Sequence, residues 1–324
     1  MKARITGIGS YVPERVLTNA GLERMVATSD EWIVERTGIR ERRIAAQGQA
    51  CSDLGARAAD RALKDAGITA TDVDLILVAT CTGDSPLPST ACLIQHRLGA
   101  SRAAACDLSA ACCGFIYALA VGDAYVKTGA RHVLVVGAEV MSAIMDWTDR
   151  GTCVLFGDGA GAVVLAPSPG EAGILSSHLH SDGNLWDLIC VPGGGSRNPP
   201  SEKMVTEGLQ YLKMKGSETF KVAVKTLEDA AREALAANHL TVQDVDVYVP
   251  HQANIRIIKA VAQRLGLPMD KVVVNIDRYG NTSAASIPLA LDEAVKAGRI
   301  KPGSLVLIEA FGGGLTWASA VIRW

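Results

Sequence analysis

The chain has 324 residues, of which 48% are hydrophobic and 20% are charged, a balance typical of a globular α/β protein with one large or two ordinary domains. The formal net charge of −2, with no basic stripe that carries interleaved aromatic residues, gives no reason to expect a nucleic-acid partner. No apolar run approaches the roughly 20 residues that span a bilayer, and the N-terminus lacks the order of a signal peptide, so we expect a cytoplasmic protein with no membrane partner.

The predicted elements occur in the same order twice along the chain. Each copy consists of a helix, a strand, a second helix, a strand-turn-helix unit, another strand and a glycine-rich hairpin. In the first copy these elements are predicted at about 52–66, 74–80, 90–98, 103–127, 132–138 and 153–166. In the second copy they are predicted at about 217–237, 246–250, 254–265, 271–296, 304–310 and 315–323. The strands are continuous apolar runs, which indicates that helices cover both faces of their sheets.

Internal repeats support this duplication. Residues 71–80 return as 243–252, an offset of 172, and the Lys127-x-Gly129 pattern returns at an offset of 169. Carrying the offset of 169 back along the chain sets Cys112 against Asn281. The repeat predicts two α/β halves, 1–168 and 169–324, with one active site built between them.

The segment 18–43 fits neither copy, and we interpret it as an insertion. Its Thr28-x-x-Glu31 sequence is a capping-box signature, which predicts a short helix that runs through Trp32 and Arg36. A second irregular segment, 191–201, is rich in glycine and proline and is predicted to form a surface loop or lid.

Cys112 and Cys113 follow a predicted strand and three small residues, and they precede a helix-forming run. A thiol at the start of a buried helix faces the positive end of the helix dipole, which favours the thiolate and can lower its pKa to about 3.5–7.5. This position suits a nucleophile for acyl groups, although a packed core cysteine fits the pattern equally well. The sequence pattern does not decide which of the two thiols reacts.

His251 and Asn281 are the other candidate site residues. His251 ends the strand before Pro250, and active sites of α/β sheets gather at the carboxyl ends of strands. Asn281 lies in a Gly-Asn pair that by itself predicts an ordinary turn, and a lone histidine is more often structural. The repeat favours a functional role for both residues, because a thiol, an imidazole and an amide on corresponding turns supply one nucleophile and two hydrogen-bond donors.

The eight cysteines and six histidines show no metal-ligand spacing, because no C-x-x-C pair occurs and no histidine is suitably placed beside one. We therefore predict no metal site, and we expect most of the thiols to be reduced and buried.

Six motifs give the chain a close resemblance to the β-ketoacyl-acyl-carrier-protein synthase III family, within the thiolase-like superfamily of condensing enzymes. The motifs are DEWIVERTGIRERR (30–43), DLSAACCGF (107–115), DRGTCVLFGDGAGA (149–162), VPHQANIRI (249–257), YGNTSAAS (279–286) and EAFGGGLTW (309–317). The resemblance implies two pseudosymmetric α/β halves in a layered α-β-α-β-α arrangement. It also implies Cys112 as the nucleophile, His251 and Asn281 as the decarboxylation pair, and an oxyanion hole from the backbone of Cys112 and Gly313.

The activity implied is the condensation of a short acyl-CoA with malonyl-acyl-carrier protein, which releases CoA and carbon dioxide and initiates type II fatty-acid synthesis. No cofactor is implied, since CoA arrives as a substrate thioester and the phosphopantetheine is carried by the partner. The residues implied for CoA binding are Thr28, Trp32, Arg36, Arg150 and Asn254. Those implied for carrier-protein binding are Lys221, Arg256 and Arg264.

The acyl pocket implied by the resemblance includes Leu87 and Phe311, and Leu87 occupies a position that some members supply from the partner subunit of a homodimer. Leucine has intermediate bulk there, so we expect an acetyl or slightly longer primer. One methylene group changes discrimination by only about 1–3 kcal/mol, which limits what a single residue can decide.

Other functions remain open at this stage. A sister condensing enzyme of secondary metabolism, making an alkylquinolone or a polyketide starter, would use the same three residues. A biosynthetic thiolase carries a second cysteine where this chain has Asn281. A cysteine hydrolase would release the acyl group to water, and a catalytically inactive scaffold would have no reactive thiol at Cys112.

Overall fold

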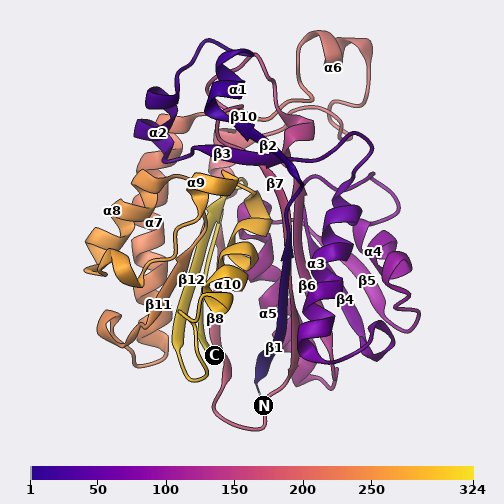
Figure 1. Cartoon of the computed structure of the whole chain (residues 1–324), viewed down its shortest axis with the longest axis vertical. Helices are drawn as coiled ribbons and strands as arrows, with labels where there is room; N and C mark the ends of the chain where they lie inside the picture. Colours follow the sequence, from indigo (N-terminus) through magenta and orange to yellow (C-terminus); the bar gives the residue numbers. More distant parts are fainter. Residues whose placement is uncertain (1) are drawn as a thin grey trace.

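The computed structural model describes residues 2–324, which form two large mixed β-sheets that lie side by side (Figure 1). The first sheet has the strand order β1-β7-β6-β4-β5 and the second has the order β11-β12-β13-β8. The strands of the first sheet are β1 (Ala3–Tyr11), β4 (Leu75–Ala79), β5 (Ala104–Leu108), β6 (Val133–Val140) and β7 (Asp158–Pro167). Those of the second are β8 (Gly173–Ser181), β11 (Val247–Pro250), β12 (Leu305–Gly312) and β13 (Thr316–Arg323).

Helices form three layers around the two sheets. The outer face of the first sheet is covered by α3 (Cys51–Ala66) and α4 (Thr90–Leu98), and the outer face of the second by α7 (Gly216–Ala237) and α8 (Ile255–Leu265). Between the sheets lie α5 (Gly114–Lys127) and α10 (Ser286–Lys296) (Figure 1). Three apolar clusters fill the spaces between these layers. The predicted α-β-α-β-α arrangement is therefore confirmed.

The sequence pattern accounts for these layers. Every residue of β4 and β6 is buried, as expected for continuous apolar runs covered on both faces. The helix α3 instead buries one apolar face and ends at Gly67, whose left-handed φ of 67° closes the helix.

The two sheets are copies of each other. Read from the edge at which they adjoin, β1, β7, β6 and β4 correspond to β8, β13, β12 and β11. The fifth strand of the first sheet, β5, has only a single bridge between Tyr248 and Val272 as its counterpart, so the predicted strand near residue 271 is not formed. As a result, the second sheet has four strands and the first has five.

The structure corrects the pairing of Cys112 with Asn281. The 3₁₀ turns η2 (Ala111–Cys113) and η7 (Ser283–Ala285) each precede an inner helix, and each begins at a residue of positive φ, 46° at Ala111 and 49° at Ser283. Their offset is 172, so Cys112 corresponds to Ala284. The offset of 169 applies only after the inner helices, because α10 has 11 residues where α5 has 14.

Small elements gather at one end of the layers, at the top of Figure 1. They are β2 (Arg15–Thr18), α1 (Asn19–Glu23), α2 (Asp30–Thr37), β3 (Glu41–Ile44), β9 (Ile189–Cys190), α6 (Glu202–Thr206), β10 (Lys213–Met214) and α9 (Ile276–Tyr279). The helix α2 occupies the predicted place, but its N-cap is Ser29, whose side chain accepts a hydrogen bond from the backbone N–H of Trp32. The predicted Thr28 cap is wrong by one residue.

The segment 191–201 contains no helix or strand, as predicted. Across residues 2–324, none of the helices combines the length and the apolar character that crossing a membrane requires.

Candidate active site

A single cavity of about 490 Å³ lies where the two halves meet. Its walls include side chains of Cys112, His251 and Asn281, together with Gly313 and Phe311. Three distant stretches of sequence thus bring the three predicted chemical groups to one space. The cavity wall also includes five residues predicted for CoA or carrier-protein binding, namely Trp32, Arg36, Asn254, Lys221 and Arg256.

The position of Cys112 depends on a close approach by the second half of the molecule. The carboxyl end of β12 runs past the η2 turn, and a Cβ atom placed on Gly312 would lie 2.7 Å from the backbone nitrogen of Cys112. Only glycine leaves this space open. The Cys112 thiol is therefore held between its own turn and the end of a strand from the other sheet.

The electrostatics of Cys112 differ from the prediction. Burial raises the pKa of its thiol to about 12, the carboxylate of Glu139 adds to this rise, and a hydrogen bond with Ser283 opposes it. The structure does not support the expected lowering of this pKa, because burial is the largest influence on the thiol. Moreover, Cys112 belongs to the η2 turn and not to the first turn of α5, whose N-cap is Cys113. A thiol in this setting needs a proton acceptor when it reacts.

His251 follows β11, and its backbone N–H donates to the carbonyl of Glu309, 2.8 Å away. Its Nδ1 lies 2.5 Å from Oγ of Ser286, while its buried Nε2 has no protein partner within residues 2–324. Burial lowers the pKa of His251 to about 3, so the ring is neutral at physiological pH. Ser286 Oγ accepts from the backbone N–H of Gln252, and in one of the two ring tautomers it donates its own hydroxyl proton to Nδ1. The Nε2 atom then carries the ring proton and donates.

Asn281 presents its amide group in the same way. Its carboxamide oxygen accepts from the backbone N–H of Ser283 at 2.8 Å, which leaves Nδ2 as the group that can donate into the cavity. Its backbone is held on both sides by the first half of the chain, since Asn281 N donates to Leu155 O and Gly157 N donates to Asn281 O. The positive φ of 64° at Gly280 allows this close pairing.

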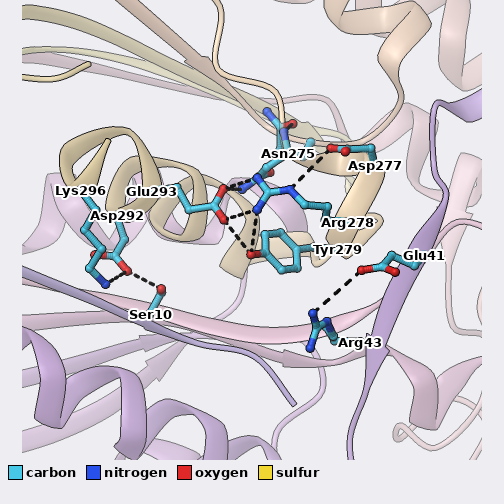
Figure 2. Close-up of polar contacts among 11 residues, drawn as sticks. Ser10, Glu41, Arg43, Asn275, Asp277, Arg278, Tyr279, Asp292, Glu293 and Lys296 are labelled. Atoms are coloured by element: carbon cyan, nitrogen blue, oxygen red, sulfur yellow. Dashed lines mark hydrogen bonds and ion pairs between the residues drawn. The ribbon is translucent and has the colours of Figure 1, made fainter. Parts of the chain in front are cut away.

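A polar cluster that the sequence did not reveal fixes the approach to Asn281. Figure 2 shows Glu293 of α10 accepting hydrogen bonds from Asn275, Arg278 and Tyr279, at distances of 2.6–2.9 Å. Asn275 is the N-cap of the short helix α9, and Arg278 and Tyr279 are its last two residues. This helix leads directly into the turn that carries Asn281. Glu293 therefore ties this turn to α10, the helix that also supplies Ser286 to His251.

The predicted CoA residues meet at the mouth of the cavity. The guanidinium groups of Arg36 and Arg150 lie over the Trp32 ring, 4.9 Å and 4.7 Å from its centre. Arg150 also donates to the carbonyl of Ala27 at 3.1 Å, and it lies outside the cavity wall. Thr28 likewise lies outside the wall, and its buried hydroxyl has no protein partner in the described chain. Asn254 caps α8 through Arg256 N and donates to the carbonyl of Arg36 at 3.0 Å.

The three predicted carrier-protein residues separate into two groups. Lys221 and Arg256 line the cavity, and Arg256 lies over the Phe220 ring at 5.6 Å. Arg264 lies outside the cavity wall and pairs at 2.9 Å with Glu228, which also binds Arg232. Of the three residues, Lys221 and Arg256 therefore add to the positive charge that Arg36 brings to the cavity wall.

The predicted acyl-pocket residues also separate. Phe311 lines the cavity, whereas Leu87 is 86% exposed and lies outside the cavity of its own chain. Several apolar residues of the cavity wall were not predicted from the sequence, because the strands and loops that carry them come together only in the folded structure. They are Met141, Leu155, Phe156, Ile189, Leu212 and Met214.

Among the polar residues around the site, Ser283, Ser286 and Glu139 were not singled out from the sequence. The two serines lie inside the NTSAAS segment beside Asn281. Glu139 could have been predicted as a functional residue, because it is a charged residue near the end of the otherwise apolar stretch 133–140.

Comparison with known proteins agrees with this geometry. Residues 106–183 match the family described as 3-oxoacyl-[acyl-carrier-protein] synthase III, and residues 235–324 match the C-terminal part of that enzyme. A β-ketoacyl-[acyl-carrier-protein] synthase III from Alkalilimnicola ehrlichii is 58% identical over 324 residues, which cover 99% of each chain.

Two solved structures are similar over nearly the whole chain. The 3-oxoacyl-[acyl-carrier-protein] synthase III of Aquifex aeolicus has a TM-score of 0.93 at 48% identity, covering 99% of this chain and 100% of that one. The priming β-ketosynthase of the R1128 polyketide pathway has a TM-score of 0.92 at 39% identity, covering 99% of this chain and 96% of that one.

Proposed function

The chain belongs to the β-ketoacyl-acyl-carrier-protein synthase III family, and from this premise we propose which of its residues carry out the reaction. It is an acyl-transferring condensing enzyme that initiates fatty-acid synthesis, with acyl-CoA and malonyl-acyl-carrier protein as its substrates. The observation that supports the assignment most strongly is the shared cavity of Cys112, His251 and Asn281.

In the first half-reaction, the sulfur of Cys112 attacks the carbonyl carbon of acyl-CoA, and the carbon–sulfur bond to CoA breaks. The negative oxygen of the tetrahedral intermediate is stabilised by the backbone N–H groups of Cys112 and Gly313. The close passage of Gly312 along the Cys112 backbone supports this pairing, because it brings the two N–H groups to neighbouring positions.

In the second half-reaction, malonyl-acyl-carrier protein replaces CoA and loses carbon dioxide. The enolate oxygen that forms accepts hydrogen bonds from Nε2 of His251 and Nδ2 of Asn281. The enolate carbon then attacks the acyl group on Cys112 and releases the sulfur. Two neutral donors suit this step, since they stabilise a developing negative charge and need not exchange protons.

The cavity mouth provides a consistent path for both substrates. Trp32 presents its ring to an adenine base, and Arg150, whose guanidinium lies 4.7 Å from the ring centre, must move aside to admit the base between them. Arg36 also lies over the Trp32 ring, at 4.9 Å. Lys221 and Arg256 would attract the acidic surface of a carrier protein. Thr28 and Asn254 would add supporting contacts to CoA. Arg264 is less suited to bind the carrier protein, because it already forms an ion pair with Glu228.

We further propose that the enzyme acts as a homodimer in the cytoplasm, and that a second copy covers β5. This strand is the edge of the first sheet, and its residues Ala104, Cys106 and Asp107 are exposed. Leu87 is exposed as well, so it is available to reach the acyl pocket of a partner subunit. A closed, apolar pocket wall with an added leucine favours acetyl or a slightly longer primer.

The relatives favour fatty-acid synthesis over a polyketide starter function. Identity is 58% to the β-ketoacyl-[acyl-carrier-protein] synthase III of Alkalilimnicola ehrlichii and 39% to the R1128 priming β-ketosynthase.

The proposal is tested by incubating the protein with a panel of acyl-CoA thioesters and then with malonyl-acyl-carrier protein, followed by mass spectrometry of the intact protein. One acyl group should appear on the peptide that contains Cys112, and it should disappear when the malonyl substrate is added, with release of carbon dioxide. Loss of the acyl group as a free acid, before any malonyl substrate is present, would instead indicate a hydrolase.

A further inference from the structure

Glu139 is a fully buried acidic residue at the end of β6, and it lies beside the Cys112 thiol. We propose that the Glu139 carboxylate accepts the proton of Cys112 during acyl transfer, through the hydroxyl of Ser283. This inference depends on the proposed role of Cys112 as the nucleophile. It adds the group that receives the proton, which neither His251 nor Asn281 is suited to provide.

The surroundings of Glu139 form a prepared site for a negative charge. Five donors from two segments converge on its two oxygens, from Thr80, Thr82, Ser283 and both the backbone N–H and the thiol of Cys81. Such a shell stabilises the ionised carboxylate despite its burial. Burial nevertheless raises the pKa of Glu139 above its usual range, which makes the carboxylate a stronger base than an exposed one.

Ser283 connects this carboxylate to the nucleophile. Its hydroxyl donates to Oε1 of Glu139 at 3.0 Å, and it shares the cavity wall with Cys112, where it opposes the rise in the pKa of that thiol. The backbone N–H of Ser283 donates to the side-chain oxygen of Asn281 at 2.8 Å. The positive φ of 49° at Ser283 is part of the same turn geometry.

The charge balance of the cavity favours this route. A Cys112 thiolate next to an ionised Glu139 would place two negative charges close together, and the carboxylate raises the pKa of the thiol. If the proton moves to Glu139, the site holds one negative charge before and after the transfer. His251 is a poor alternative acceptor, because burial lowers its pKa to about 3.

The titratable groups that face Glu139 are thiols from three elements. They are Cys51 of α3, Cys81 after β4 and Cys112 of η2. Burial raises the pKa of each, and the Asp84 and Asp107 carboxylates act on Cys51 from farther away. Among the described residues, no lysine, arginine or histidine contributes to the pKa of Glu139.

The transfer is balanced in atoms and charge. The Cys112 proton passes to Ser283 Oγ while the Ser283 proton passes to Oε1 of Glu139, so the serine hydroxyl reverses its direction and now donates to the thiolate. The thiolate forms its bond to the acyl carbon, and the bond to the CoA sulfur breaks. The proton held on Glu139 returns through Ser283 to the departing sulfur, and CoA leaves as the thiol.

The test compares Glu139→Gln with the wild type in each half-reaction separately. Acyl loading from acetyl-CoA should be about 10²-fold slower in Glu139→Gln, the usual effect of removing a general base. After long incubation has loaded the variant fully, a single turnover with malonyl-acyl-carrier protein should release carbon dioxide at close to the wild-type rate. Glu139→Asp should restore part of the loading rate.

The pH profile of loading separates a proton acceptor from a structural role. In the wild type, loading should rise as Glu139 ionises and then level off. In Glu139→Gln it should keep rising about tenfold per pH unit toward the raised pKa of the Cys112 thiol. Thr80→Val removes one donor to Glu139 but keeps the carboxylate, so it should keep the plateau and move the rise to higher pH.

Ser283→Ala provides an independent variant, since it breaks the middle of the relay and leaves Glu139 in place. It should slow loading as Glu139→Gln does, and it decides the question if Glu139→Gln does not fold. Loading at the wild-type rate and pH profile in either folded variant, or an equal loss in both half-reactions, would overturn the inference. Failure of the wild type to load Cys112 would instead overturn the proposed function.

Discussion

The turns η2 and η7 have the same backbone and different chemistry. Both start at a residue of positive φ, both run into an inner helix, and they are related by an offset of 172. In the first half this turn carries the nucleophile Cys112, whereas in the second half Asn281 lies just before the turn and Ser283 begins it. The duplication produced two turns with equivalent backbones. The proposed acyl transfer and decarboxylation use residues at different positions in these turns.

Each turn is also braced by a strand from the opposite half. Gly312 of β12 packs against the Cys112 turn, while a Cβ atom on Gly137 of β6 would lie 2.4 Å from the carbonyl oxygen of Ala284 in the other turn. Neither half can therefore form its part of the site alone.

The largest effect that separates the two turns is expected for Cys112→Ala. This variant removes the only sulfur that we assign to acyl transfer, so no acyl group should be retained after incubation with acetyl-CoA. Carbon dioxide release from malonyl-acyl-carrier protein should remain detectable, because the donors of the second turn are untouched. Mass spectrometry and a carbon dioxide assay measure the two, and acyl loading elsewhere on the variant would contradict the assignment.

A paired substitution tests the bracing of each turn. Gly312→Ala should slow acyl loading, whereas Gly137→Ala should slow decarboxylation and, through the displaced Ser283, loading as well, each by up to about 10²-fold, since the added methyl group displaces one turn by a fraction of its contact distance. Thermal unfolding serves as the control, because both changes also destabilise the fold. Identical defects of the two variants in both half-reactions would show that the turns do not act separately.

The sequence predicted the elements of the site but not the tertiary contacts between the two halves. The strands, the inner helices and the motif residues Cys112, His251 and Asn281 were located from periodicity and resemblance. The equivalence of the two turns was misplaced, because the three-residue shortening of α10 falls between the repeat and the turn. The high pKa of Cys112 and the Glu293 cluster arise from tertiary packing, which no local pattern encodes.

A moderate effect is expected at the mouth of the cavity, outside both turns. Trp32→Ala removes the ring on which Arg36 and Arg150 lie, so the KM for acyl-CoA should rise about tenfold with little change in kcat. The single-turnover rate with malonyl-acyl-carrier protein should stay near that of the wild type. A fall in kcat without a change in KM would place Trp32 in the chemistry and not in CoA binding.

The smallest effect is expected for the ionisation of His251. Its folded pKa of about 3 lies below the unfolded value of about 6.5, so the ring stays neutral in the enzyme as the pH falls from 8 to 5. Carbon dioxide release from fully loaded enzyme should show no inflection from His251 in this range. The free energy of unfolding should decline below about pH 6.5, because His251 is protonated in the unfolded chain and stays neutral in the folded one. NMR titration of the imidazole provides the check, and a pKa near 6.5 would contradict the account.

The division of labour between the two turns is tested most directly by Asn281→Ala. When this variant is incubated with acetyl-CoA, mass spectrometry should find one acyl group on the Cys112 peptide at close to the wild-type rate. On addition of malonyl-acyl-carrier protein, that group should be cleared about 10²–10³-fold more slowly than in the wild type, because one donor to the enolate is missing. Failure of the variant to load, or clearance at the wild-type rate, would contradict the assignment of separate steps to the two turns.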